Sequence, residues 1–275
     1  MKDIDGDGKP EIIFGGSGVY AYAKPDPQNI SAKWKITPIS EQMDRINNHG
    51  MGVGDINGDG RLDLVTPTGW FEQPPAGSEG KPWKFHEANF GEGGAEMGVY
   101  DVNGDGLNDV VTSLQAHGFG LAWFEQKRSV DGTITFVRHD IAGDYSTAAS
   151  NAGGVTFSQP HAETFADMDG DGIPDLVVGK SMWHHLEGWG DPDPYGPAVL
   201  YVYRTVRDPQ APGGARFVPE LVNNRSGVGS AIQVVDLNHD GAPDIITQSA
   251  LGTFVFYGHP GKWPKAANVQ TKAAK

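Results

Sequence analysis

The fold is decided by the stretch DMDGDGIPDLV, residues 167–177, because the same pattern recurs four more times in the chain. The other copies align with it without gaps: DIDGDGKPEII at 3–13, DINGDGRLDLV at 55–65, DVNGDGLNDVV at 101–111 and DLNHDGAPDII at 236–246. The copies begin roughly 45 to 70 residues apart, and such recurrence indicates a fold built from repeated units.

Each copy is suited to binding a metal ion through oxygen atoms. Carboxylate or amide side chains occupy loop positions 1, 3, 5 and 9, and position 6 is always glycine, which suits a sharp turn with positive φ. This number of hard oxygen ligands favours Ca²⁺ over Mg²⁺. Position 12 is apolar or small rather than glutamate, which excludes an EF-hand. The alternative, an Asp/Gly turn without metal, is disfavoured because five copies stand in register.

The predicted calcium ligands are the residues at these four positions in the five copies. In chain order they are Asp3, Asp5, Asp7, Glu11, Asp55, Asn57, Asp59, Asp63, Asp101, Asn103, Asp105, Asp109, Asp167, Asp169, Asp171, Asp175, Asp236, Asn238, Asp240 and Asp244.

Runs typical of β-strands precede and follow the loops, for example 51–54 and 62–65. The strand–DxDGDGxxD–strand unit resembles the FG-GAP/VCBS-type repeat of calcium-binding β-propellers over nearly the whole chain. The resemblance implies an all-β propeller with four antiparallel strands per blade, the innermost leading into the loop. We expect a propeller over 1–260, with blades beginning near 1, 49, 95, 161 and 230, and a C-terminal tail over 261–275.

The number of blades in the complete ring is left open by the ends of the repeat pattern. The first copy lacks an innermost strand and the last lacks an obvious outer strand. The five calcium-loop blades therefore form either a closed five-bladed ring or part of a larger ring of about seven blades.

Composition and charge exclude several classes of function. The formal net charge is -14, and five bound Ca²⁺ ions would reduce it to about -4. Lys and Arg form no cluster, which argues against nucleic-acid binding. No apolar run is long enough to span a membrane, and the chain has no Cys. We expect a secreted or periplasmic protein. No signal peptide precedes Asp3, and we therefore expect it to lie outside this sequence.

Five histidines are expected to share the face opposite the calcium loops. His49 and His161 stand where innermost strands begin, and His117 and the pair His184/His185 follow second strands. In antiparallel units these connections lie at the end opposite the loops. A single loop histidine is usually polar surface, but five on one face, with aromatic residues, favour a ligand site. His86 and His139, on outer strands, are interpreted as structural.

The residues expected to act at this site fall into two groups. The candidate catalytic residues are His117, His161, His185 and Tyr195 as acid/base groups, with Lys180 as a charge stabiliser. The candidate ligand-binding residues are His49, Glu163, Trp70, Trp183, His184 and Trp189.

A closer resemblance concerns AHGFGLAWFEQ from Ala116, FSQPHAETFADMDGDG from Phe157 and GKSMWHH from Gly179. These stretches resemble a bacterial group of secreted VCBS-type propellers, which is similar to the propeller domain of aldos-2-ulose dehydratase, a carbohydrate lyase. The resemblance implies a sugar-related role and a transition metal such as Zn²⁺ held by histidines. The cupin-like domains of that enzyme have no counterpart in this chain.

Two classes of function follow from these observations. The first is a carbohydrate-related ligand site on the histidine face, with lyase or dehydratase activity. The alternative is a non-catalytic module that binds a glycan or a protein through the same face. A carbohydrate or another small molecule is the expected ligand, and a protein partner remains open.

Overall fold

The computed structural model describes residues 1–44, 46, 49–78, 81–182 and 190–261. The regular secondary structure of the described part is β-strand, apart from three short 3-10 turns at Tyr145–Thr147, Ala152–Gly154 and Pro212–Gly214. This confirms the all-β prediction. Among the described residues, no helix has the length and apolar character needed to cross a membrane.

The strands form five consecutive antiparallel units, which we call units 1 to 5. Unit 1 holds β1 (Ile12–Gly16), β2 (Val19–Lys24) and β3 (Lys35–Pro38), and unit 2 holds β4 (Met51–Gly54), β5 (Asp63–Thr66), β6 (Gly69–Glu72) and β7 (Lys84–Glu87). Unit 3 holds β8 (Glu96–Tyr100), β9 (Asp109–Ser113), β10 (Leu121–Arg128) and β11 (Ile134–Ala142), and unit 4 holds β12 (Ala162–Ala166), β13 (Asp175–Gly179), β14 (Leu200–Arg207) and β15 (Ala215–Asn223). Unit 5 holds β16 (Ile232–Val235), β17 (Asp244–Ser249) and β18 (Gly252–Phe256). Units 2 and 3 share one eight-stranded sheet because β4 pairs in parallel with β8.

The strands predicted around the loops agree closely with the observed ones. The segments 51–54 and 232–235 coincide with β4 and β16. In unit 1 the innermost strand is reduced to an isolated bridge between Lys2 and Glu11. Among the described residues, unit 5 has no fourth strand.

The hydrophobic core lies between successive units. Tyr100 and Trp123 of unit 3 pack in one cluster with Leu176 and Tyr203 of unit 4. Corresponding clusters join unit 1 to unit 2, unit 2 to unit 3 and unit 4 to unit 5. The second strands β5, β9 and β13 are buried along their whole length because units cover both of their faces.

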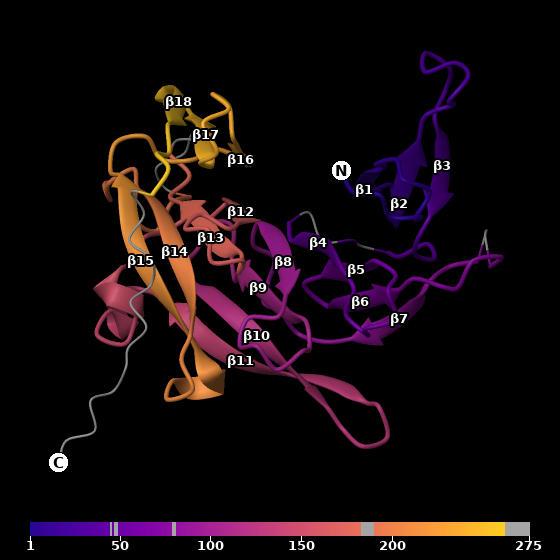
Figure 1. Cartoon of the computed structure of the whole chain (residues 1–275), viewed down its shortest axis with the longest axis horizontal. Coiled ribbons are helices and arrows are strands. Elements are labelled where there is room, and N and C mark those ends of the chain that lie inside the picture. Colours follow the sequence, from indigo (N-terminus) through magenta and orange to yellow (C-terminus); the bar gives the residue numbers. More distant parts are fainter. Residues whose placement is uncertain (45, 47–48, 79–80, 183–189, 262–275) are drawn as a thin grey trace.

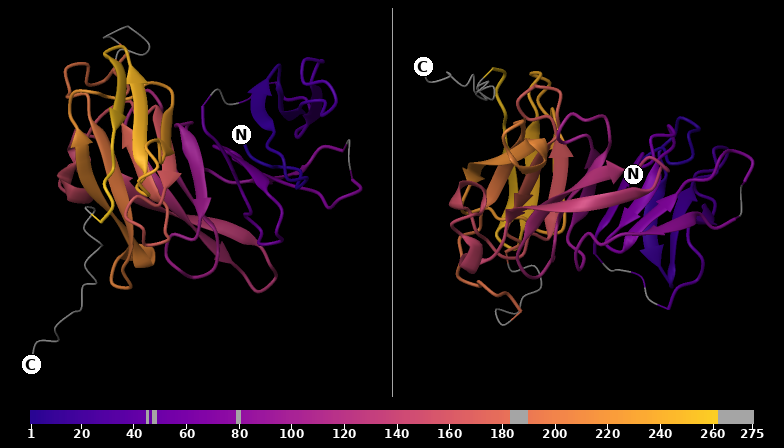
Figure 2. Two further views of the ribbon diagram at one scale, coloured as in Figure 1. Left: turned by 45° about the horizontal axis from the view of Figure 1, so that its top comes forward. Right: turned by 90° about the horizontal axis from the view of Figure 1, so that it is seen from below.

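The units are arranged along an arc. The first strand of each unit contacts that of the next: β4 contacts β8, β8 contacts β12, and β12 contacts β16. Figure 1 shows the units in chain order, with β1–β3 at one end of the arc and β16–β18 at the other, and both views of Figure 2 show the indigo β1–β3 well separated from the yellow β16–β18. This is a β-propeller-like arrangement. The size of the complete ring stays a prediction.

Glycine allows the first strands to approach closely. A Cβ atom on Gly98 of β8 would lie 2.7 Å from ring carbons of Phe165 in β12, and one on Gly54 of β4 would lie 2.4 Å from Cβ of Val99. Real side chains do not tolerate such separations. Glycine at these positions therefore sets how tightly neighbouring units pack around the inner edge of the arc.

We expect Gly98→Ala to lower the free energy of unfolding by about 1–3 kcal/mol, because the added methyl group forces units 3 and 4 apart. Urea unfolding in excess Ca²⁺ measures this effect. Gly16→Ala is the control, since its added Cβ would lie 3.9 Å from the nearest side chain, that of Phe14. Equal losses in the two variants would contradict this account of unit packing.

Candidate metal centres

Each cation loop, meaning positions 1 to 9 of one repeat, leads from the first strand of its unit to the second. In unit 2, Asp55 accepts the backbone N–H groups of Gly58, Asp59 and Gly60 at 2.7, 3.1 and 2.8 Å. Gly60 has a φ of 85°, which lets the chain turn back toward Asp55. The loops of units 3 and 4 repeat these contacts.

Loop position 9 anchors the loops of units 2 to 5 to the sheet. Asp109 is fully buried; its Oδ2 accepts the N–H of Val102 at 3.0 Å and its Oδ1 accepts the N–H of Gln126, after Glu125 in β10, at 2.8 Å. The same pair of bonds forms at Asp63, Asp175 and Asp244. Sequence reasoning assigned position 9 only as a ligand and missed this structural role.

Burial changes the titration of these anchoring carboxyls. It raises the pKa of Asp109 and of Asp175 to about 7 and that of Asp63 to about 6, and neighbouring loop aspartates act in the same direction. The carboxylate form is therefore costly in the folded protein unless a positive charge lies beside it.

The residues present fit a divalent cation. Asp3, Asp5 and Glu11 offer oxygens within 4.8 Å of one another, and so do Asp167, Asp169 and Asp175. In the first of these clusters Asp3 Oδ1 and Glu11 Oε1 are buried and accept no hydrogen bond, and the ammonium of Lys24 already lies among the loop carboxylates. Oxygen atoms of carboxylates, amides and backbone carbonyls are the ligands that Ca²⁺ prefers. Bound calcium would supply the positive charge that such clusters need.

A second cluster, of histidines, lies at the other end of the strands. We call His49, His117 and His161 the histidine cluster. The ring centroid of His49 lies 4.9 Å from that of His117 and 4.7 Å from that of His161, and the last two are 5.1 Å apart. One ligand nitrogen from each ring lies within 4.8 Å of the others. His161 is buried, His49 half-buried and His117 exposed.

The path of the chain explains why the histidine cluster and the cation loops lie apart. His161 directly precedes β12, whereas Asp167 directly follows it, and a five-residue strand is about 17 Å long. His117 follows the far end of β9, which begins at Asp109 in the loop.

Backbone hydrogen bonds hold the segments that carry the histidine cluster. Gln159 donates its N–H to the carbonyl of Gly118 at 2.7 Å. Its own carbonyl accepts the N–H groups of His161 at 2.7 Å and Ser181 at 2.8 Å. Gln159 adopts a φ of 54° to make these bonds, an uncommon conformation for a residue other than glycine. This residue therefore links the turn after His117 to the start of β12.

The structure corrects several expectations for the residues around the cluster. Trp70, a candidate ligand-binding residue, is only 3% exposed and stacks on His86 with ring centroids 4.0 Å apart, so its ring belongs to the core. Lys180 is fully buried, and its ammonium binds Asp191 at 2.6 Å and Ser158 at 2.5 Å. Its charge is therefore already paired within the fold.

Glu163 and Tyr195 differ in their access to ligands. Glu163 is fully buried and accepts the N–H of Ser113 at 2.9 Å, which joins unit 4 to unit 3. Burial, with the nearby Glu96, raises the pKa of Glu163 well above its ordinary value. Tyr195 is 97% exposed. Trp183, His184, His185 and Trp189 lie outside the described residues, so their expected roles stay predictions.

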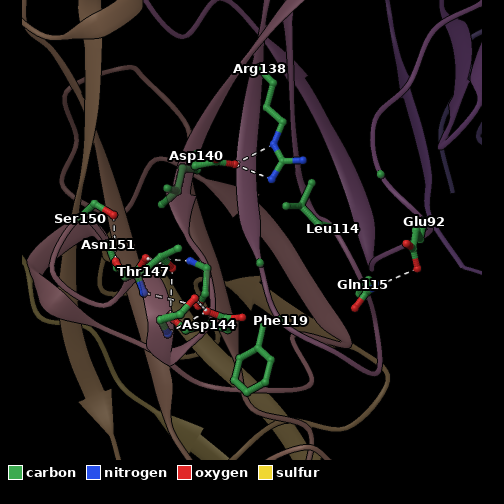
Figure 3. Close-up of a pocket in the computed structure, with 15 residues that line it drawn as sticks. Glu92, Leu114, Gln115, Phe119, Arg138, Asp140, Asp144, Thr147, Ser150 and Asn151 are labelled. Atoms are coloured by element: carbon green, nitrogen blue, oxygen red, sulfur yellow. Dashed lines mark hydrogen bonds and ion pairs between the residues drawn. The ribbon is translucent and has the colours of Figure 1, made fainter.

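A depression of about 640 Å³ lies beside unit 3 (Figure 3). Gln115 and Phe119, which flank His117 in the sequence, both line it. Polar side chains in the depression pair with one another: Arg138 Nε donates to Asp140 at 2.6 Å, and Gln115 Nε2 donates to Glu92 at 2.5 Å. Sequence reasoning did not identify this depression, because its lining residues come from three separate segments.

We expect the stability of the metal-free protein to fall as pH rises from about 5 to about 8. Asp109 and Asp175 titrate at about 7 in the folded protein and near 3.9 when unfolded, so the folded state binds more protons in this window. Saturating Ca²⁺ should reduce the decline, because it binds the carboxylate form. Thermal midpoints at three pH values, in EDTA and in Ca²⁺, measure both effects. A midpoint in EDTA that rises with pH would contradict this expectation.

Removal of the side chain at loop position 5 and removal of the side chain at loop position 9 should have different effects on the stability of the protein. Asp105→Ala should remove only the Ca²⁺-dependent stability that its own loop contributes. Asp109→Ala should also destabilise the protein in EDTA, because the N–H groups of Val102 and Gln126 lose their buried acceptor, at about 1–3 kcal/mol each. Urea unfolding of both variants in EDTA and in Ca²⁺ tests the difference. Two variants with the same stability in EDTA would rule out the anchoring role.

Comparison with known families agrees with this geometry. A family model described as FG-GAP-like repeat matches residues 3–66 and 101–178, which together are just over half of the chain. The matched segments contain the first four cation loops. A search of curated proteins found no match. The repeated loops, the antiparallel units and the family match point to one conclusion: this chain belongs to the FG-GAP-like repeat family.

Proposed function

We propose that this protein is a calcium-stabilised, secreted propeller-like module that binds a carbohydrate-type ligand at the histidine cluster. The observation that carries the proposal is the meeting of His49, His117 and His161, which come from the neighbourhoods of three successive units. The cation loops stabilise the fold at one end of the strands, and the ligand binds at the other.

The histidine cluster has the composition of a transition-metal site, and its ligand atoms lie near the spacing that such a site needs. Nitrogen atoms at 2.0–2.1 Å from a common zinc ion lie roughly 3.3–4.1 Å apart. The ligand atoms of the cluster lie within 4.8 Å of one another, so a contraction of about 1 Å suffices. Three imidazoles would leave a coordination position for an oxygen of the ligand. A bound metal of this kind supplies Lewis acidity.

The surroundings of the cluster favour an oxygen-rich ligand. The neighbouring depression combines the ion pair of Arg138 and Asp140 with the hydrogen-bonded pair of Gln115 and Glu92. Phe119 adds an aromatic face to this polar lining. A few placed polar groups with an apolar surface are typical of sites that hold small ligands. The resemblance to propellers related to aldos-2-ulose dehydratase points to a sugar.

A carbohydrate lyase or dehydratase is the second candidate, and the exposure of His117 favours it. In such a reaction a base removes the proton α to a carbonyl or carboxylate, and the β-oxygen substituent leaves. An accessible imidazole that holds no metal is suited to that proton transfer. Non-catalytic binding of a glycan or a protein is the other outcome, and it would show as affinity without turnover.

His117→Ala and His161→Ala should each weaken zinc binding at least about 100-fold, because loss of an outer-shell partner alone costs 10–100-fold. Both should also weaken carbohydrate binding on a glycan array and abolish any release of unsaturated product. The melting transition that depends on Ca²⁺ should stay nearly unchanged.

His259→Ala is the matched control, because His259 is exposed and lies in unit 5 beyond β18. Isothermal titration with Zn²⁺ measures the metal affinity directly. Zinc binding by His117→Ala at wild-type affinity would refute the metal site, even if the variant still bound glycans.

A further inference from the structure

The five cation loops differ in one residue outside the loop. Loop position 9 stands at the start of the strand that follows the loop. The next antiparallel strand brings one residue opposite position 9, and we call it the facing residue. In unit 3, Val110 pairs with Phe124, so Glu125 faces Asp109; in unit 4, Leu176 pairs with Tyr203, so Arg204 faces Asp175. The same register gives the facing residues in all five units: Lys24, Glu72, Glu125, Arg204 and Tyr257.

The identity of the facing residue follows that of loop position 3. The two loops with aspartate there, Asp5 and Asp169, have the cationic facing residues Lys24 and Arg204. The loops with Asn57 and Asn103 have the anionic facing residues Glu72 and Glu125, and the loop with Asn238 has Tyr257. An added negative charge in the loop is thus matched by a positive charge on the third strand.

Direct contacts connect the two positions in three units. Lys24 Nζ lies 2.5 Å from Asp5 Oδ2, and Arg204 Nη1 lies 3.7 Å from Asp169 Oδ2. In unit 3 the amide nitrogen of Asn103 donates to Glu125 at 3.2 Å. The facing residue therefore interacts with a side chain that a bound cation also needs.

Lys24 reaches further into its loop than Arg204 does. Its ammonium lies 2.6 Å from Asp7 Oδ2 and 3.8 Å from Glu11 Oε1, in addition to the contact with Asp5. Glu11 is fully buried, and this oxygen accepts no hydrogen bond. Arg204 also contacts Glu220, which lies outside the loop, at 2.5 Å. Only in unit 1, among the described residues, does a facing residue contact three loop carboxylates.

We propose that Lys24 is the resident cation of the first loop, so that this loop does not take up Ca²⁺ while the other four do. The ammonium contacts three of the four carboxylates that would ligate calcium, and both cations cannot occupy one set of oxygens. Calcium would first have to displace Lys24, which would leave the lysine charge beside a divalent ion. The inference rests on calcium binding by the other loops, which is part of the proposed function.

The proposal predicts a change in the number of bound ions. Wild-type protein should bind about four Ca²⁺ per chain, and Lys24→Gln should bind about five, because the variant frees the loop oxygens and removes the competing charge. In EDTA, Lys24→Gln should melt at a lower temperature than wild type, since its first loop then holds unbalanced carboxylates. Equilibrium dialysis with Ca²⁺ after removal of metals, together with thermal melting, measures both quantities.

Lys35→Gln is the matched control, because Lys35 pairs with Lys24 across β2 and β3 and is exposed. It removes the same charge without touching the loop, so its calcium count should equal that of wild type. Tyr257→Lys is the reciprocal variant: Tyr257 is 55% exposed, and a lysine there should lower the count by about one. This surface change tests the idea even if Lys24→Gln fails to fold in EDTA.

The outcomes separate the two proposals. Wild-type protein that binds no Ca²⁺ would overturn calcium binding by the loops and this inference with it. Wild-type protein that already binds five ions, or a Lys24→Gln variant with the wild-type count, would overturn the role of Lys24 alone. One additional ion in Lys24→Gln, absent in Lys35→Gln, supports it.

Discussion

The fold depends on one recurring interaction, the pair of hydrogen bonds that the buried carboxylate at loop position 9 accepts from the backbone. In unit 3, Asp109 binds the N–H of Val102 within its loop and that of Gln126 after the third-strand residue Glu125. Both bonds are enclosed by the stacked units, where an unpaired N–H is costly. The same enclosure raises the carboxyl pKa, so the loop becomes a place where a cation is stabilising.

The stacking of the units then divides the molecule into two chemically different ends. Each first strand runs from a connection near its neighbours to a cation loop, so loops gather at one end and connections at the other. Gly54 and Gly98 let the first strands approach closely. As a result, His49, His117 and His161 meet although they lie far apart in the sequence. One topology thus builds both the end that carries the cation loops and the end that carries the histidine cluster.

The repeats share a motif but do not share one local charge balance. In units 2 and 3 the facing glutamates Glu72 and Glu125 bind His86 at 2.7 Å and His139 at 3.0 Å. Each of these histidines also stacks on a tryptophan of the third strand. In unit 1 the facing residue is Lys24 instead, inserted among loop carboxylates. Equivalent loops therefore have different neighbours, which gives a physical basis for different affinities.

The sequence by itself determined the strands, the loops and the side of each unit on which the histidines lie, because turn chemistry and strand alternation act within about ten residues. Only the tertiary structure decided what neighbouring units bury: Trp70 became core, Glu163 became a link between units, and Lys180 was paired with Asp191. It also brought one nitrogen from each of three histidines within 4.8 Å of the others. These outcomes depend on how separate sheets twist and stack, and no local pattern encodes the distance between two sheets.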